Sequence, residues 1–164
     1  MLGFGISDLS IINVFQNSYV DDPFLFKITS VWGSHEGSIL LWIFLINIYG
    51  IIFLRKNTDK QIHKQIIFIS SLFIIYLVIS SNPFENVKAT SIDQGMGLNP
   101  ILQNALFVIH PPTLFLGYIG LLIPFVLSSH ILITKNFSEG LFTQMLYWSK
   151  ISWFFLTLGI VLGS

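Results

Sequence analysis

Long apolar runs alternate with short polar connections along most of the chain. A helix that crosses the hydrocarbon of a bilayer needs about 20 mainly apolar residues. The runs that reach or approach this length are residues 36–54, 65–80, 111–133 and 147–163. The second and the fourth are short, and flanking residues would complete them. The pattern predicts an all-α integral membrane protein with about four transmembrane helices.

The same runs suggest how the chain is divided. Residues 1–35 carry no run of this length, so we expect them to form an N-terminal segment outside the membrane. Residues 36–164 would form the polytopic membrane bundle. No internal repeat or low-complexity tract is visible in the sequence.

Basic residues predict the orientation of this bundle. Six of the eight lie in the connections after the first and third spans or at the start of the fourth: Arg55, Lys56, Lys60, Lys64, Lys135 and Lys150. Only Lys27 and Lys88 lie elsewhere. An excess of Lys and Arg marks the side from which a membrane protein was inserted. We therefore expect the N-terminal segment, residues 81–104 and the C-terminal end to face the opposite compartment, which we call the outer side.

Composition and charge exclude several classes of function. Charged residues make up 10% of the chain, against roughly 25% in soluble domains. The net charge is zero, which argues against a nucleic-acid partner because phosphates require a basic surface. There is no Cys, so disulfides, thiolate metal sites and Cys nucleophiles are excluded. The N-terminus resembles neither a secretory signal nor a transit peptide, so a protein located in an organelle would be made there.

The stretch "LFVIHPPTLFLGYIG" places His110 directly before two prolines and an apolar run. A residue before proline is biased away from the α region, and Pro111 suits the first turn of a helix. We therefore expect His110 at a corner before the third span, with residues 99–109 as a short outer-side interfacial helix. The imidazole could ligate iron or another metal, or relay protons. Alternatively, it caps the helix and bonds a neighbouring loop.

The stretch "VWGSHEGSILLW" places His35 and Glu36 at the outer end of the first span. Ser34 is a predicted N-cap, and Glu36 in the first turn would stabilise the positive helix end. Gly33 and Gly37 would allow backbone or a flat ligand to approach closely. A role in helix capping and contact with a bound polar group both remain open.

The other candidate side chains have simpler interpretations. His63 lies between Lys60 and Lys64 and is expected to be exposed, whereas His130 at the inner end of the third span is expected to pack or to reach the surface. Pro124 is expected to kink that span, with its freed carbonyl partnered by a neighbour.

Several motifs together resemble one known family. "WGSHEGSILLW", "SNPFE", "LNPILQNALFVIHPPTLFLGYIG" and "WFFLTLGIVLGS" occur in this order. Their order and spacing are similar to those of the CcmF/NrfE family, the integral membrane haem lyases of the bacterial-type cytochrome c maturation system, which some mitochondria retain. The resemblance runs from about residue 7 to residue 164.

The resemblance implies a cofactor and a set of site residues. His110 matches an outer-side histidine that is an axial ligand to the haem iron. His35 and Glu36 belong to a motif near the same pocket, and Trp32 and Pro111 lie within the same two motifs. The resemblance implies that these four residues bind the haem together with His110. In the family, haem arrives on a chaperone and becomes attached to the CxxCH thiols of apocytochrome c. Because this chain has no Cys, the sulfur would come from the substrate.

Departures from the family pattern imply partner chains. Relatives carry further helices before the matching region and continue beyond it into a tryptophan-rich haem-handling segment and the remaining haem-ligand histidines. The resemblance thus implies one part of a split haem lyase, embedded in membrane lipid and inactive without those partner chains. The expected location is the mitochondrial inner membrane with His110 facing the intermembrane space. The alternative is a bacterial inner membrane with His110 facing the periplasm.

A different class of function remains as an alternative. The chain could be a small subunit of a respiratory or proton-translocating complex, with His35 and Glu36 in a proton path. That function requires polar or charged residues deep within several spans, whereas these spans are nearly free of them between their ends. A purely structural membrane subunit, in which His110 would be replaceable, is a third option.

Overall fold

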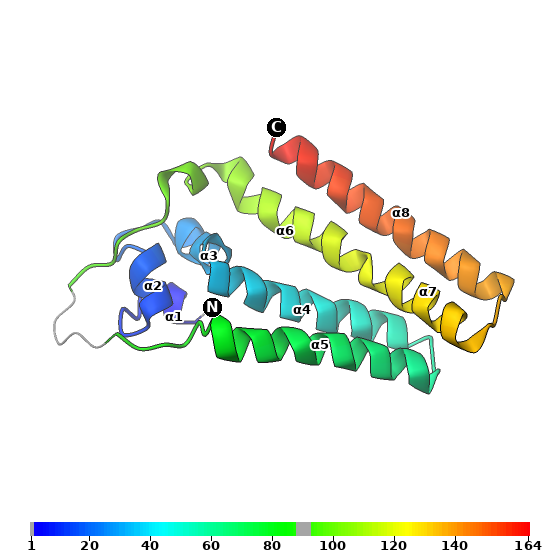
Figure 1. Cartoon of the computed structure of the whole chain (residues 1–164). Helices are drawn as coiled ribbons and strands as arrows, with labels where there is room; N and C mark the ends of the chain where they lie inside the picture. The colour runs from blue at the N-terminus through cyan, green and yellow to red at the C-terminus, as the bar shows by residue number, and fades with distance from the viewer. Residues whose placement is uncertain (1, 88–92) are drawn as a thin grey trace. The chain divides into compact units, whose positions relative to one another are not determined.

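A computed structural model describes residues 2–87 and 93–164 as an all-α protein (Figure 1). The helices are α1 (Leu2–Gly5), α2 (Ile12–Asn17), α3 (Phe24–Gly33), α4 (His35–Leu54), α5 (Lys60–Ser80), the 3-10 turn η1 (Pro100–Leu102), α6 (Ala105–Gly120), α7 (Leu122–Thr134) and α8 (Glu139–Leu162). Among the described residues, the β-type pairing is limited to an isolated antiparallel bridge between Ile11 and Asn86. The predicted fold class is confirmed.

In the part of the chain that the structure describes, four stretches are long and apolar enough to cross a membrane: His35–Leu54, Lys60–Ser80, Val108–Thr134 and Glu139–Gly163. The second and fourth do extend into flanking polar residues, as their short apolar runs suggested. Asp59 explains the earlier start of α5, because its Oδ1 accepts hydrogen bonds from the backbone N–H of Gln61 (2.7 Å) and Ile62 (3.3 Å). Such an N-cap satisfies donors that the first turn leaves unpaired.

The third span consists of two helices. α6 ends at Gly120, and α7 begins at Leu122. Pro124 lies in the first turn of α7, where its missing N–H is tolerated, but its ring would clash with the carbonyl of Gly120 in a continuous helix. The expected effect of Pro124 therefore takes the form of a break centred on Leu121.

The expected corner at His110 is wrong. Helix α6 begins at Ala105 and runs through His110, Pro111 and Pro112, so residues 99–109 do not form a separate interfacial helix. Asn104 starts the helix, since its Oδ1 accepts a hydrogen bond from the N–H of Leu106 (3.0 Å). The preference of a residue before proline for extended backbone is modest, and the capped helix overrides it.

The described residues form two compact units. The first takes the chain up to Leu41 and from Ile75 to Ile109, and the second takes Trp42–Ile74 and His110–Ser164. Helices α4, α5 and α6 each contribute residues to both units. The predicted division at residue 35 separates a segment outside the membrane from the membrane bundle, whereas these two units are defined by packing. The division at residue 35 therefore stays a prediction.

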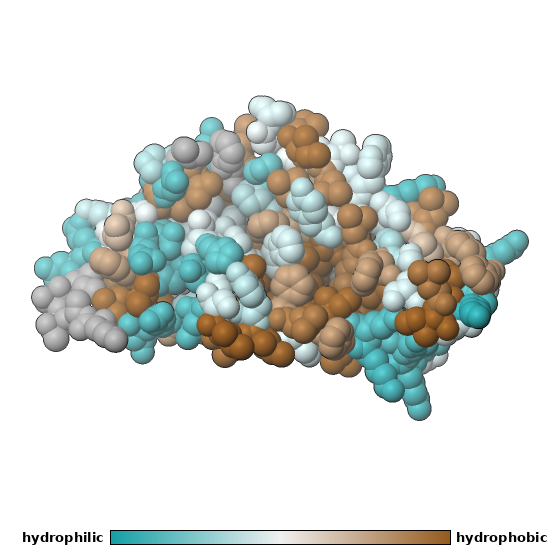
Figure 2. Space-filling model, in the orientation of Figure 1, coloured by the Kyte–Doolittle hydropathy of each residue, from teal (hydrophilic) through white to brown (hydrophobic). Residues whose placement is uncertain are grey.

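Each unit has its own core. In the first, Phe4, Val14 and Val31 are buried, and Trp32 packs against them. In the second, Ile123, Val126 and Leu127 of α7 are fully buried. By contrast, many large apolar side chains on the spans are exposed, among them Phe68 and Ile79 of α5 and Trp153 of α8. Figure 2 shows brown, apolar patches on its visible face. An apolar exterior is what lipid-facing helices require.

Candidate functional site

His110 lies near the start of α6 and is held by the backbone of α8. Its Nδ1 is 2.7 Å from the carbonyl oxygen of Gly159. A carbonyl can only accept, so Nδ1 carries the hydrogen and donates it. In the neutral ring, the lone pair is then on Nε2. Metal-ligating histidines commonly make such a bond, which fixes both the tautomer and the orientation of the ring.

Gly163 leaves room for this imidazole. A Cβ atom added to Gly163 would overlap Cε1 of His110 and would lie 2.7 Å from Nδ1 and 2.9 Å from Nε2. The end of α8 can therefore lie directly against the ring only because position 163 has no side chain. Gly159 and Gly163 are one helical turn apart, so both contacts with His110 come from the same face of α8.

The same face of α8 makes further close contacts with α6. We call this series of contacts the α6–α8 seam. Each contact pairs a glycine on one helix with a larger side chain on the other. The pairs are Gly163 with His110, Gly159 with Leu114, Gly117 with Leu156, and Gly120 with Ser152. Small residues that admit a neighbouring side chain are the usual means of packing helices in membranes. The pair of His110 and Gly163 lies at one end of the seam. Packing along the rest of the seam therefore helps to position His110.

His35 and Glu36 begin α4 in the first unit. The hydroxyl oxygen of Ser34 accepts a hydrogen bond from the N–H of Gly37 (3.0 Å), which confirms the predicted N-cap. His35 is exposed, and its Nε2 lies 3.2 Å from the hydroxyl of Tyr76, with the two rings edge to face. Glu36 lies in the first turn of α4, where a carboxylate stabilises the positive helix end.

The glycines around His35 and Glu36 serve the packing of the protein itself. A Cβ on Gly37 would overlap the backbone oxygen of Val31, and one on Gly33 would lie 2.9 Å from Cδ1 of Leu98. The space that the sequence suggested for a flat ligand is therefore filled by backbone and leucine side chains.

Alanine at Gly37 is expected to destabilise the first unit strongly. The added methyl group would collide with backbone, which cannot rotate away as a side chain can, so the cost should reach at least about 3 kcal/mol, the upper end of overpacking effects. The thermal midpoint of the purified protein in detergent measures it. Gly5→Ala is the matched control, because a Cβ there meets nothing within 4 Å. Equal midpoints for the two variants would contradict the close approach at Gly37.

Trp32 belongs to the core of the first unit. Its ring packs against the cluster of Phe4, Val14 and Val31. Its backbone oxygen accepts a hydrogen bond from the hydroxyl of Ser38 (2.9 Å). Its Nε1 is buried without a hydrogen-bond partner among the described residues. These contacts give the indole a structural role, and its contact with haem stays a prediction.

The predicted site residues fall into two groups. Trp32, His35 and Glu36 belong to the first unit, and His110 and Pro111 belong to the second. Within residues 2–87 and 93–164, no group of three or more His, Asp or Glu side chains could hold a metal ion. In the second unit, the oriented imidazole of His110 can supply one axial ligand.

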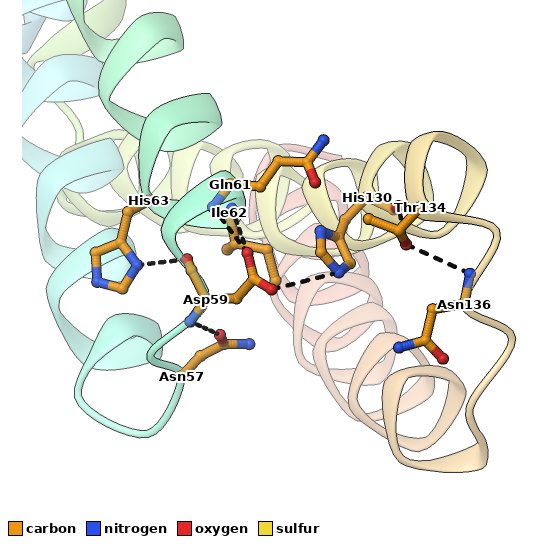
Figure 3. Close-up of polar contacts among 8 residues, drawn as sticks. All are labelled: Asn57, Asp59, Gln61, Ile62, His63, His130, Thr134 and Asn136. Carbon is orange, nitrogen blue, oxygen red and sulfur yellow. Dashed lines mark hydrogen bonds and ion pairs between the residues drawn. The ribbon is translucent and has the colours of Figure 1, made fainter.

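Two other histidines lie near Asp59 in the second unit (Figure 3). His63 is partly exposed, and its Nδ1 is 2.7 Å from the backbone oxygen of Asp59. His130 is buried on α7, and its Nε2 is 3.8 Å from Oδ2 of Asp59. Asp59 thus caps α5 and also faces α7. The packing role expected of His130 is therefore observed.

Sequence reasoning missed Gly159 and Gly163. The stretch "GIVLG", residues 159–163, carried a usable signal. Two glycines four residues apart in an apolar run mark a helix face that another helix approaches closely. It could not have shown which side chain fills the space.

Comparison with known proteins places this arrangement in a family. A family model described as "Cytochrome C assembly protein" matches residues 32–164, which include both histidine motifs and the whole α6–α8 seam. The chain belongs to the cytochrome c assembly protein family. Within the family, it is a CcmF/NrfE-type cytochrome c biogenesis protein and a multi-pass membrane protein.

Individual relatives are bacterial. The chain is 36% identical to the cytochrome c-type biogenesis protein CycK of Bradyrhizobium diazoefficiens, over 96% of this chain and 25% of the relative. It is 33% identical to CcmF of Haemophilus influenzae and 30% identical to CcmF of Escherichia coli, over 98% of this chain and 26% of each relative. The chain thus spans about a quarter of the length of these relatives. No solved structure matches it.

Proposed function

We propose that this chain forms part of the haem-binding site of a cytochrome c haem lyase, with Nε2 of His110 as one axial ligand to the iron of the haem substrate. The observation that carries the proposal is the 2.7 Å contact between Nδ1 of His110 and the carbonyl oxygen of Gly159. It fixes the tautomer that a neutral imidazole needs to bind a metal through Nε2.

The chemistry requires orientation more than acid or base groups. Each thioether forms when the S–H of an apocytochrome thiol adds across a haem vinyl group, so one C–S and one C–H bond form and no oxidant is consumed. Holding the macrocycle still while the CxxCH segment approaches is the main contribution that a protein can make. The absence of Cys from this chain fits a role in which both thiols come from the substrate.

Other parts of the site would come from further polypeptide, in this chain or in partner chains. We propose that these parts supply the second axial histidine and a tryptophan-rich surface for the macrocycle, and that a haem chaperone and apocytochrome c complete the assembly. The coverage of about a quarter of each relative supports this division of the site.

We place the site on the outer side of the mitochondrial inner membrane, facing the intermembrane space. Lys135 follows the end of α7, so the basic end of the second unit and His110 lie at opposite ends of the third span. The bacterial relatives also fit the alternative, in which His110 faces the periplasm.

Purification of the full chain with its membrane partners tests the proposal. The complex is expected to retain haem whose visible spectrum is that of six-coordinate, low-spin iron with two nitrogen ligands. A complex that supports cytochrome c assembly but retains no haem, even when haem is added during purification, would contradict it.

Glu36→Gln separates this function from the proton-path alternative. We expect the variant to lower cytochrome c assembly several-fold and to leave the proton gradient of membrane vesicles unchanged. Between the ends of the spans in the second unit, neutral polar side chains pair with one another, as Asn47 does with Ser70 (3.2 Å) and Gln65 with Ser129 (3.2 Å). Loss of the gradient with normal cytochrome c levels would favour the alternative.

A further inference from the structure

A groove in the second unit is not used by the proposed haem site. Its volume is about 660 Å³, and residues of α4, α6 and α8 line it. Ile48 and Ile52 of α4 form one wall, and Ile151 and Phe155 of α8 form the other. Ile52 is 50% exposed, so the groove opens onto the surface of the span rather than into the core.

The groove is apolar along most of its length and polar at one end. Along α4, the lining changes from Ile48 and Ile52 to Lys56, which follows the end of the helix. Along α8, it changes from Phe155 and Ile151 to Gln144. Both polar residues are exposed. The C-terminal end of α4 and the N-terminal half of α8 both supply polar residues to the same end of the groove. Both walls therefore change from apolar to polar in the same direction along the groove.

The length of the groove matches one leaflet of a bilayer. At a rise of 1.5 Å per residue, Ile48 lies about 9 Å from the end of α4 at Leu54, and Lys56 follows just beyond that end. Along α8, Gln144 and Phe155 are about 16 Å apart. Half of the hydrocarbon thickness is about 15 Å. A further transmembrane helix would need a groove of about twice this length, whereas an acyl chain needs only this depth.

Aromatic residues line the groove beside its polar end, and one of them, Tyr147, is exposed there. Tyr147 and Trp148 both line the groove next to Gln144. Tyr147 is 62% exposed, and amphipathic rings of this kind lie at the level of lipid headgroups. Among the residues that line the groove, Lys56 is the cation, and Arg55 and Lys60 lie close to it in the sequence. Basic pockets between helices on this side of a membrane bind anionic headgroups.

We propose that this groove binds one anionic phospholipid from the leaflet on the Lys/Arg-rich side. The headgroup phosphate lies at Lys56 and Gln144. An acyl chain follows the apolar wall past Ile52 and Ile151. The bound lipid covers the exposed apolar surface between α4 and α8 and fills the space between the two helices.

Native mass spectrometry of the full chain with its co-purifying partners tests the proposal. Dioleoyl phosphatidylglycerol and dioleoyl phosphatidylcholine are titrated separately. We expect the protein to bind phosphatidylglycerol at least fivefold more tightly than phosphatidylcholine. Lys56→Gln should abolish this preference. Lys60→Gln is the matched control, because it removes a neighbouring exposed cation that does not line the groove. Equal binding of the two lipids, or equal loss in both variants, would overturn the proposal.

A second measurement identifies the occupant. A benzophenone amino acid at position 52 is irradiated in membranes, and the adduct is analysed by mass. A phospholipid adduct that is lost when Lys56→Gln is introduced supports the proposal. A polypeptide adduct would show that a protein segment fills the groove and would overturn it.

Discussion

Replacement of His110 by alanine is expected to abolish cytochrome c assembly and to lower the haem content of the purified complex by at least about 100-fold. Groups that merely orient a metal ligand are worth 10- to 100-fold in affinity, and the ligand itself should be worth more. Haem staining of membrane cytochromes and the ratio of haem to protein in the complex measure the two effects.

His63→Ala is the matched control for this prediction. His63 is also a partly exposed histidine whose Nδ1 lies 2.7 Å from a backbone carbonyl oxygen, that of Asp59. It lies at the basic end of the bundle, so its loss should leave haem content and cytochrome assembly unchanged. His110→Gly with added imidazole should restore part of the haem, because free imidazole can replace the missing ligand. Normal cytochrome assembly in His110→Ala would show that this histidine is not a ligand.

Alanine at Gly163 is expected to reduce haem retention by about 10- to 100-fold although His110 is still present. The added methyl group would occupy the position of the imidazole, so either the ring must turn or the last turn of α8 must move. Both movements disturb the bond from Nδ1 to the carbonyl of Gly159 and redirect the lone pair of Nε2. The haem content and the visible spectrum of the complex report this change.

Gly140→Ala is the control that separates the loss of space beside His110 from a general effect of replacing glycine by alanine in or beside α8. Gly140 lies in the first turn of the same helix, and a Cβ there meets nothing within 4 Å. This variant should behave as the wild type. A further control is the amount of complex recovered, which should be similar for both variants because His110 is only half-buried. If Gly163→Ala retained haem as well as Gly140→Ala does, the close contact with His110 would have no role in positioning it.

Much of the fold could be predicted because apolar runs of membrane length have few alternatives. The cap at Ser34 was also predictable, since capping depends on residues within one turn. The predicted corner at His110 was wrong because the local preference of a residue before proline was the only signal considered. The N-cap at Asn104 starts the helix earlier and carries it through His110.

The arrangement around His110 could be predicted only in part. The motif left a metal ligand and a helix cap open, the family resemblance implied the ligand, and that role stays a prediction. The acceptor of the Nδ1 hydrogen of His110 is 49 residues away in the sequence. No local pattern reports a contact of that range. Sequence reasoning missed the glycines at 159 and 163, whose spacing could have indicated close helix packing. The residue opposite each glycine is given only by the register of α6 against α8. Similarly, Gly33 and Gly37 indicated a close approach without showing that Leu98 and the backbone of Val31 make it.

The partner of His110 on α8 is part of the main chain, and this has a consequence for genetics. Every amino acid at position 159 supplies a carbonyl oxygen, so no substitution can delete the acceptor outright. Loss-of-function alleles on α8 should therefore be enriched in changes of size at Gly159 and Gly163, and compensating second-site alleles should shrink the facing residue, such as Leu114. A selection for restored cytochrome c would reveal that pattern of paired volumes.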